Sequence, residues 1–228
     1  MEMKQKISIK TQDTYILFKI KIGQKRTLLD AAMFKVATLY NLAKQRNVYA
    51  FIQLMQIHSD IENLLNDIQA NIKKSKKLIK KRVKYLPKVV TPVQEECQFG
   101  FSNPIHFGLI QLLQNFDDCV SWLILAKSSN VFAHQNGFYG LKNRIRKRVF
   151  RLLSEIIRTN FKKFPQINFN NYFNNDEHYK KAVIDHGKVD PELLYNAINS
   201  AVTPLLTPEE LNKAIGQLKK MVLNENKR

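Results

Sequence analysis

Apolar residues recur along most of this chain at steps of three and four, which is the period of an amphipathic α-helix. The start of the chain differs, because Lys6-Ile7-Ser8-Ile9-Lys10 alternates polar and apolar residues as a half-exposed strand does. These patterns predict a strand over 5–10, a short strand over 98–101, and helices over about 11–22, 27–46, 49–84, 104–127 and 136–159. The expected fold is mainly α, a helical bundle with a short N-terminal β-strand.

The pattern changes after Asn160, which predicts a boundary between two parts of the chain. Residues 1–160 are expected to form a basic helical main domain. Residues 161–175, rich in Asn and Phe, are expected to be a linker. Residues 176–228 are expected to form a small helical C-terminal region, in which Asp190 and Thr207 each precede a proline and acids. That arrangement is typical of helix N-termini.

The net charge belongs to the first part of the chain alone. Residues 1–163 hold 29 Lys and Arg against 11 Asp and Glu, which accounts for the whole net charge of +18. Residues 164–228 hold eight of each. A region with such an excess repels itself, and a polyanionic partner offsets the repulsion. The excess favours nucleic acid or an anionic membrane surface as the partner, although an AT-rich genome can also contribute lysines.

Two helical stretches concentrate this charge. Residues 73–84 contain eight bases in twelve positions, and like charges four residues apart destabilise a helix. Phosphates would offset that repulsion, with release of counterions. The second stretch, 142–151, is rich in Arg, which forms forked hydrogen bonds to phosphate. The candidate phosphate contacts are Lys73, Lys74, Lys76, Lys77, Lys80, Lys81, Arg82, Lys84, Lys142, Arg144, Arg146, Lys147, Arg148 and Arg151. An ordinary solvated surface is the alternative.

Two blocks of sequence resemble a family of integrating-conjugative-element proteins called AcaB-like. The first block runs from Ile7-Ser8-Ile9-Lys10-Thr11 to Asn47-Val48-Tyr49-Ala50, just before a long helix with Asp60 and Glu62. The second runs from Phe99-Gly100-Phe101-Ser102-Asn103-Pro104 through Phe116-Asp117-Asp118-Cys119-Val120 to Leu123-Ile124-Leu125-Ala126. The resemblance covers residues 5–158, and its relatives are less basic along the two helices.

The resemblance implies a dimeric DNA-binding regulator of conjugative transfer genes with a ribbon-helix-helix arrangement. In that arrangement a strand from each of two subunits pairs antiparallel, and the ribbon lies in the DNA major groove. Lys6, Ser8 and Lys10 would then face the bases, while Ile7 and Ile9 face the dimer core. Lys25 and Arg26, before a helix N-terminus, would contact a phosphate. An edge strand whose lysines block further pairing is the alternative.

The sequence contains no convincing catalytic, metal or cofactor site. It has no P-loop, GxGxxG, GxSxG or HExxH motif. Cys97, His106, Cys119 and His134 fit no common zinc spacing. Asp117 and Asp118 lie within an apolar helix, and we expect them to reach solvent or to pair with a base such as Arg144 or Arg148. The protein is therefore not expected to be an enzyme.

These observations together predict a DNA-binding protein of a mobile genetic element, with double-stranded DNA and a second copy of itself as partners. The chain has no apolar leader, its apolar run 99–126 is interrupted by polar residues, and its cysteines look reduced, so a cytoplasmic protein without a membrane span is expected. The region 176–228 is a candidate surface for a protein partner. The rival is a conjugation accessory protein that docks on a protein or on anionic lipid, and RNA binding is a third interpretation.

Overall fold

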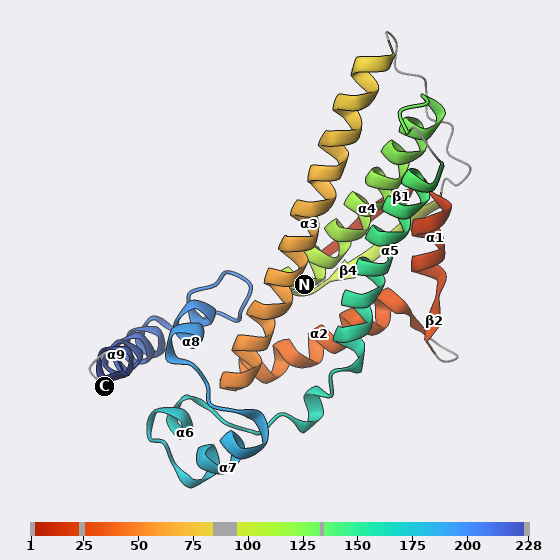
Figure 1. Cartoon of the computed structure of the whole chain (residues 1–228). Coiled ribbons are helices and arrows are strands. Elements are labelled where there is room, and N and C mark those ends of the chain that lie inside the picture. The colour runs from red at the N-terminus through yellow and green to blue at the C-terminus, as the bar shows by residue number, and fades with distance from the viewer. Residues whose placement is uncertain (1–2, 23–25, 84–94, 133–134, 226–228) are drawn as a thin grey trace. The chain divides into compact units, whose positions relative to one another are not determined.

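The computed structural model describes residues 3–22, 26–83, 95–132 and 135–225. Its fold is mainly α, as the sequence predicts (Figure 1). The strands are β1 (Met3–Ile9), β2 (Lys21–Ile22), β3 (Arg26–Thr27) and β4 (Glu95–Phe101). The helices are α1 (Gln12–Lys19), α2 (Leu28–Lys44), α3 (Val48–Arg82), α4 (Pro104–Ser128), α5 (Gln135–Arg158), α6 (Phe169–Phe173), α7 (Glu177–His186), α8 (Pro191–Ile198) and α9 (Pro208–Glu225).

The chain divides into two compact units. The first comprises residues 1–34, 59–102 and 106–158, and the second comprises 35–58, 103–105 and 159–228. The chain therefore passes between the units within α2 and within α3. The segment expected as a linker contains a 3₁₀ turn, Phe161–Lys163, and the helix α6, with Phe161, Ile167 and Tyr172 buried in the second unit.

Helices α3, α4 and α5 lie side by side in the first unit, with α5 antiparallel to the other two (Figure 1). Each presents an apolar stripe to the shared core, because residues three and four apart fall on one helix face. Buried members include Ile68 and Ile79 of α3, Phe116 of α4, and Val149 and Leu153 of α5. Burial of such side chains stabilises the unit by roughly 2 kcal/mol each.

Strand β1 pairs antiparallel with β4 of the same chain, with Lys6 opposite Gln98 and Ser8 opposite Glu96. The sequence interpretation paired β1 with the same strand of a second subunit, whereas within the chain its partner is β4. Pairing between subunits stays a prediction. The pairing partner lies far along the sequence, and only the packing of α4 brings it to β1. The predicted alternation is confirmed, since Ile7 and Ile9 are buried while Lys6, Ser8 and Lys10 are exposed.

Helix α1 ends at Lys19, three residues earlier than the sequence predicts. The backbone N–H of Leu28 donates to the Ile20 carbonyl, and β2 pairs with β3 directly after the helix. These bonds compete with continuation of the helix. The other helix boundaries in the first unit lie within one or two residues of their predicted positions, as capping signals and the apolar period allow.

The second unit contains α6 to α9 and the adjoining ends of α2 and α3. Helix α8 packs against α9, and both begin as predicted with a proline after an Asp or Thr. The Asp190 carboxylate accepts from the backbone N–H groups of Glu192 and Leu193. These caps satisfy backbone donors that a helix N-terminus leaves without partners.

Candidate nucleic-acid interface

The last third of α3 carries seven bases between Lys73 and Arg82, and all seven are exposed. The helix contacts the rest of the unit through a narrow stripe, in which Ser75 and Ile79 are buried. Ile79 packs with Leu125 and Ala126 of α4, and Trp122 and Val131 adjoin this cluster. The apolar stripe therefore holds this part of α3 against α4, and the basic side chains occupy the rest of the helix surface.

No acid follows Asp67 on α3, so the basic tract has no compensating charge on its own helix. Lys73, Lys77 and Lys81 follow one another at steps of four, and such like charges repel by a few tenths of a kcal/mol per pair. Two members make contacts within the unit: the Lys76 ammonium lies 4.7 Å from the Trp122 ring centroid, and Arg82 donates to the Asn130 carbonyl. Lys84 lies outside the described residues.

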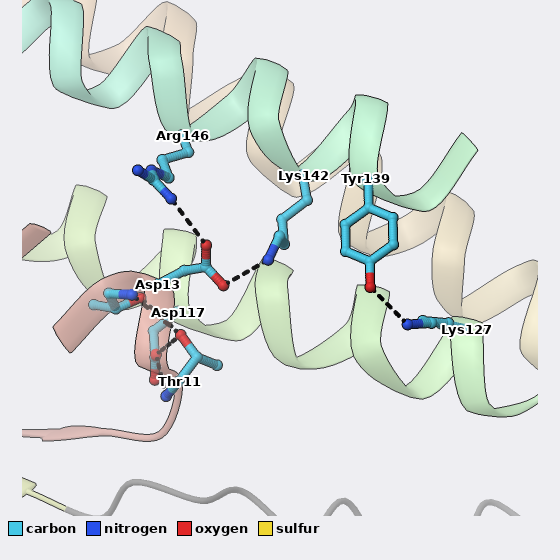
Figure 2. A network of polar contacts seen from close by, with 8 residues as sticks. Thr11, Asp13, Asp117, Lys127, Tyr139, Lys142 and Arg146 are labelled. Carbon is cyan, nitrogen blue, oxygen red and sulfur yellow. Dashed lines mark hydrogen bonds and ion pairs between the residues drawn. The ribbon is translucent and has the colours of Figure 1, made fainter. Parts of the chain in front are cut away.

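The bases of α5 are partly neutralised by acids of the same unit. Figure 2 shows Asp13, in the first turn of α1, between two of them. Its carboxylate lies 2.9 Å from the Lys142 Nζ and 3.6 Å from an Arg146 nitrogen. The Asp13 and Lys142 side chains are mostly buried, so this ion pair is shielded from salt more than a surface pair is.

Two further bases on α5 also have acidic partners. Arg148 pairs with Asp67 across the α3–α5 contact, and Arg151 pairs with Glu155 at 3.6 Å on its own helix. Arg144 and Lys147, by contrast, are exposed and form no ion pair with any residue that the structure describes. The predicted set on α5 therefore divides into four paired bases and two without an acidic partner.

Beside these bases, Tyr139 of α5 accepts a hydrogen bond at 3.0 Å from the Lys127 ammonium of α4 (Figure 2). This bond and the charge of Lys127 lower the pKa of the Tyr139 phenol. The Lys142 ammonium lies 5.8 Å from the same ring centroid. Cations thus surround an exposed aromatic ring at this end of α5.

The predicted base-contact residues on β1 differ in their surroundings. Lys6 is exposed, with its ammonium 4.0 Å from the Glu96 carboxylate on β4, and Ser8 is exposed beside it. Lys10 is engaged within the unit, since its Nζ lies 3.0 Å from the Asp118 carboxylate. That hydrogen bond raises the pKa of Lys10. Lys6 and Ser8 remain the accessible pair on this strand.

Asp118 is exposed and pairs with a base, as the sequence predicts, whereas Asp117 is buried. Asp117 is buried and accepts from the backbone N–H groups of Lys10 and Thr11 and from the Thr11 hydroxyl. Asp118 is exposed and pairs with Lys10, not with Arg144 or Arg148. These acids hold the junction between β1 and α1 against the middle of α4.

The turn before α2 is described only in part. Arg26 is exposed, and its guanidinium lies 3.9 Å from the Phe34 ring centroid in a cation–π contact. It forms no ion pair with the part of the chain that the structure describes. Lys25, predicted beside it as a phosphate contact, lies outside the described residues.

A search of solved structures finds a likeness over nearly the whole chain. The crystal structure of selenomethionine-containing AcaB from uropathogenic E. coli matches 94% of this chain and 96% of its own, with a TM-score of 0.57 and 11% sequence identity. The chain has an AcaB-like fold. No protein-family model matches the sequence, and no curated protein matches it.

At this identity, the likeness to AcaB concerns the fold alone. The AcaB-like fold here includes no helix, among the residues described, that is long and apolar enough to cross a membrane. The lysines of α3 and the arginines of α5 thus lie on a helical scaffold whose architecture a solved protein shares.

The spacing of Cys97, His106, Cys119 and His134 in the sequence does not favour a zinc site. Cys97 and Cys119 are buried free thiols, and burial raises the pKa of Cys119 to about 12. His106 is buried, with its Nε2 2.7 Å from the Met33 carbonyl. Because a carbonyl only accepts, Nε2 carries the proton, and burial lowers the pKa of this ring. His134 lies outside the described residues, and no metal-binding cluster occurs among the others.

Sequence reasoning missed the acids that divide the basic surface, chiefly Asp13 and Asp67. Thr11 caps the N-terminus of α1, since its side chain accepts from the Thr14 backbone N–H. The sequence shows Asp13 as an acid in the first turn of a helix, and its favourable interaction with the helix dipole is enough to explain an acid there. Its contact with Lys142, 129 positions later, carries no sequence pattern.

Proposed function

We propose that this chain is a DNA-binding protein of a mobile genetic element, and that it regulates conjugative transfer genes. The observation that carries the proposal is the set of seven bases between Lys73 and Arg82 of α3, which are exposed and have no acidic partner among the residues that the structure describes. A row of bases of this kind binds the phosphates of duplex DNA, with affinity that falls steeply as salt rises. Arg144 and Lys147 of α5 add two further cations.

The role in gene regulation rests on the AcaB-like fold together with the resemblance of residues 5–158 to conjugative-element proteins. Within this proposal, the exposed Lys6 and Ser8 contact base edges, and the protein acts in the cytoplasm as a homodimer. Lys10 contributes less, because Asp118 already holds its ammonium. The proposal includes no catalytic activity and no cofactor.

The surface chemistry of α3 argues against lipid as the partner of the basic tract. Helices that lie on membranes bury large aromatic and aliphatic side chains into the acyl boundary. Among the exposed large apolar residues, Leu78 lies in the tract, and it is only 38% exposed. A tract of lysines around one leucine gives a lipid surface little apolar area to bind.

The test measures binding to a labelled duplex from upstream of conjugative transfer genes and to a scrambled duplex, across a salt series. The variant carries Lys77→Gln, Lys80→Gln and Lys81→Gln. The control carries Lys181→Gln, Lys219→Gln and Lys220→Gln in the second unit, which removes the same charge from exposed helical positions. We expect the variant to reduce the slope of log affinity against log salt by about 3, and the control to leave it unchanged.

The two duplexes separate regulation from simple phosphate binding. Preference for the upstream fragment that is lost in Lys6→Ala/Ser8→Ala supports a regulator with base contacts on β1. A steep salt slope with no preference would contradict the regulatory part of the proposal. An absence of binding at physiological salt would contradict DNA binding and favour an accessory protein that docks on another protein or on lipid.

A further inference from the structure

One face of α5 carries two exposed aromatic rings with polar and basic residues between them. Tyr139 is 42% exposed and Phe150 is 41% exposed. The two positions are eleven residues apart, which is about three helical turns, so they lie on the same face of the helix. Asn143 and Arg146 fall between them on that face, and both have exposed or half-exposed side chains.

Single exposed aromatics are ordinary on protein surfaces, but an aligned pair with an amide and a basic side chain between them is a more specific arrangement. The rise of 1.5 Å per residue places the two ring positions roughly 16 Å apart along the helix. That length corresponds to about five stacked nucleotides at 3.4 Å each. It falls within the range that one single-strand-binding surface occupies, about 4 to 16 nucleotides.

The cations near this face are held in place by neighbouring helices. The Lys127 ammonium is bound to the Tyr139 hydroxyl, and Asp13 holds Lys142 and Arg146 (Figure 2). Lys147 is exposed one position after Arg146 and has no acidic partner among the described residues. Ordered cations beside exposed rings lose less side-chain freedom when a ligand binds.

We infer that the α5 face formed by Tyr139, Asn143, Arg146 and Phe150 binds single-stranded nucleic acid. The two rings stack on bases, while Arg146, Lys147 and Lys127 contact the backbone phosphates. Stacking accepts any base, because every base has a π-face, so this binding is tolerant of sequence. The inference goes beyond the proposed duplex binding and does not depend on it. The lysines of α3 carry the duplex proposal, and only Lys147 of α5 is used in both.

The experiment measures fluorescence anisotropy of a labelled twelve-nucleotide oligothymidylate with the full chain. The variants are Tyr139→Leu, Phe150→Leu and their combination, and leucine retains the apolar packing of the half-buried part of each side chain. We expect each single substitution to raise the dissociation constant roughly tenfold, from the loss of one stacked base. Tyr139→Phe, which keeps the ring and loses the hydroxyl, should bind within about twofold of the wild type.

The matched control is Phe107→Leu, another exposed aromatic of the first unit, on α4. It should leave oligothymidylate affinity unchanged. Thermal unfolding by circular dichroism checks that every variant is folded. If Phe107→Leu weakened binding as much as Phe150→Leu, or if the double variant bound as the wild type does, the inference would be wrong.

A duplex of the same length is measured in parallel, so that the two proposals fail separately. Binding to duplex without binding to oligothymidylate overturns the α5 inference and leaves the proposed function standing. Binding to oligothymidylate alone overturns the proposed duplex binding and supports the inference. An equal loss on both ligands in Tyr139→Leu/Phe150→Leu would show that the rings contribute without stacking on unpaired bases, and the stacking role would be wrong.

Discussion

Asp117 of α4 accepts two hydrogen bonds from Thr11, one at 2.9 Å from its backbone N–H and one at 2.7 Å from its hydroxyl. The residues lie 106 positions apart in the sequence. The second carboxylate oxygen accepts from the backbone N–H of Lys10 at 2.8 Å. One buried carboxylate thus satisfies three donors at the junction of β1 and α1, a place where chain direction changes and backbone groups lack helical partners.

We predict that Asp117→Ala destabilises the protein by about 3 kcal/mol, because three donors would lose a charged acceptor in a buried place. Asp118→Ala is the control, since its pair with Lys10 is exposed and such pairs contribute at most about 1 kcal/mol. Urea unfolding measures both. Equal losses of unfolding free energy in the two variants would contradict the role assigned to Asp117.

Asp13→Asn should change stability and DNA binding in opposite directions. The substitution removes the charge that Lys142 and Arg146 share, so we expect a loss of about 2 kcal/mol in unfolding free energy. It also frees two cations for phosphate, so affinity for duplex DNA at low salt should rise. Asp185→Asn, at an exposed position on α7, removes the same charge from the second unit. Comparable affinity gains in both variants would mean that net charge alone is responsible.

His106 should make the stability of the protein depend on pH below neutrality. Burial lowers the pKa of His106 in the folded state, so the unfolded chain binds the proton more readily. The contribution of the neutral ring is complete above pH 6.5 and is lost as pH falls below that value, by at most about 1.4 kcal/mol per pH unit. Chemical unfolding from pH 7.5 to 5.5 measures this slope.

Two variants test whether His106 is the group that makes the unfolding free energy depend on pH. His106→Gln should flatten the dependence of unfolding free energy on pH over this range. His178→Gln, an exposed position on α7, should retain it. An unchanged slope in His106→Gln would show that another group is responsible for the dependence.

The backbone conformation of Arg46, just after α2, should lower the free energy of unfolding. Its φ of 66° lies in the left-handed region, where a residue with a Cβ costs about 1 kcal/mol more than glycine. Its guanidinium forms two hydrogen bonds with Glu210 of α9, at 3.0 and 2.7 Å, and this pairing lowers the pKa of Glu210. Arg46→Ala and Arg46→Gly both remove that pair.

Because only the glycine variant also relieves the backbone, we predict that Arg46→Ala is less stable than Arg46→Gly by about 1 kcal/mol. Urea unfolding of the two variants gives this difference directly. Equal stabilities would indicate that the loop relaxes away from positive φ once the guanidinium is removed. Asn175→Gly, at another positive φ, provides a comparison without an ion pair.

The helices of this protein could be predicted because their signals are local. The three-and-four period of apolar residues placed α2, α3, α4 and α5 to within a few residues, and Asp190 and Thr207 marked the starts of α8 and α9. The polar and apolar alternation of β1 identified its two faces for the same reason. A side chain's face within a helix or strand depends on spacing of a few residues, which the sequence shows directly.

The partner of β1 could not be predicted from the same signals. Strand β4 supplies it from 95–101, and the pairing depends on how α4 packs. An exposed strand pairs with any strand of suitable register, so its alternation pattern leaves the partner open. The sequence interpretation named only a second subunit's strand, and it did not identify β4 as a partner for that reason.

The charges of this protein were likewise predictable from the sequence only in part. The sequence by itself determined that the bases exceed the acids before residue 164 and that they cluster on two helical stretches. Apart from Arg151 and Glu155, which lie four residues apart on one helix, only the tertiary structure decided which bases have acidic partners. Asp13, Asp67 and Asp118 reach Lys142, Arg148 and Lys10 from distant positions in the chain. Coulomb interactions depend on distance in space, and folding sets that distance independently of separation along the sequence.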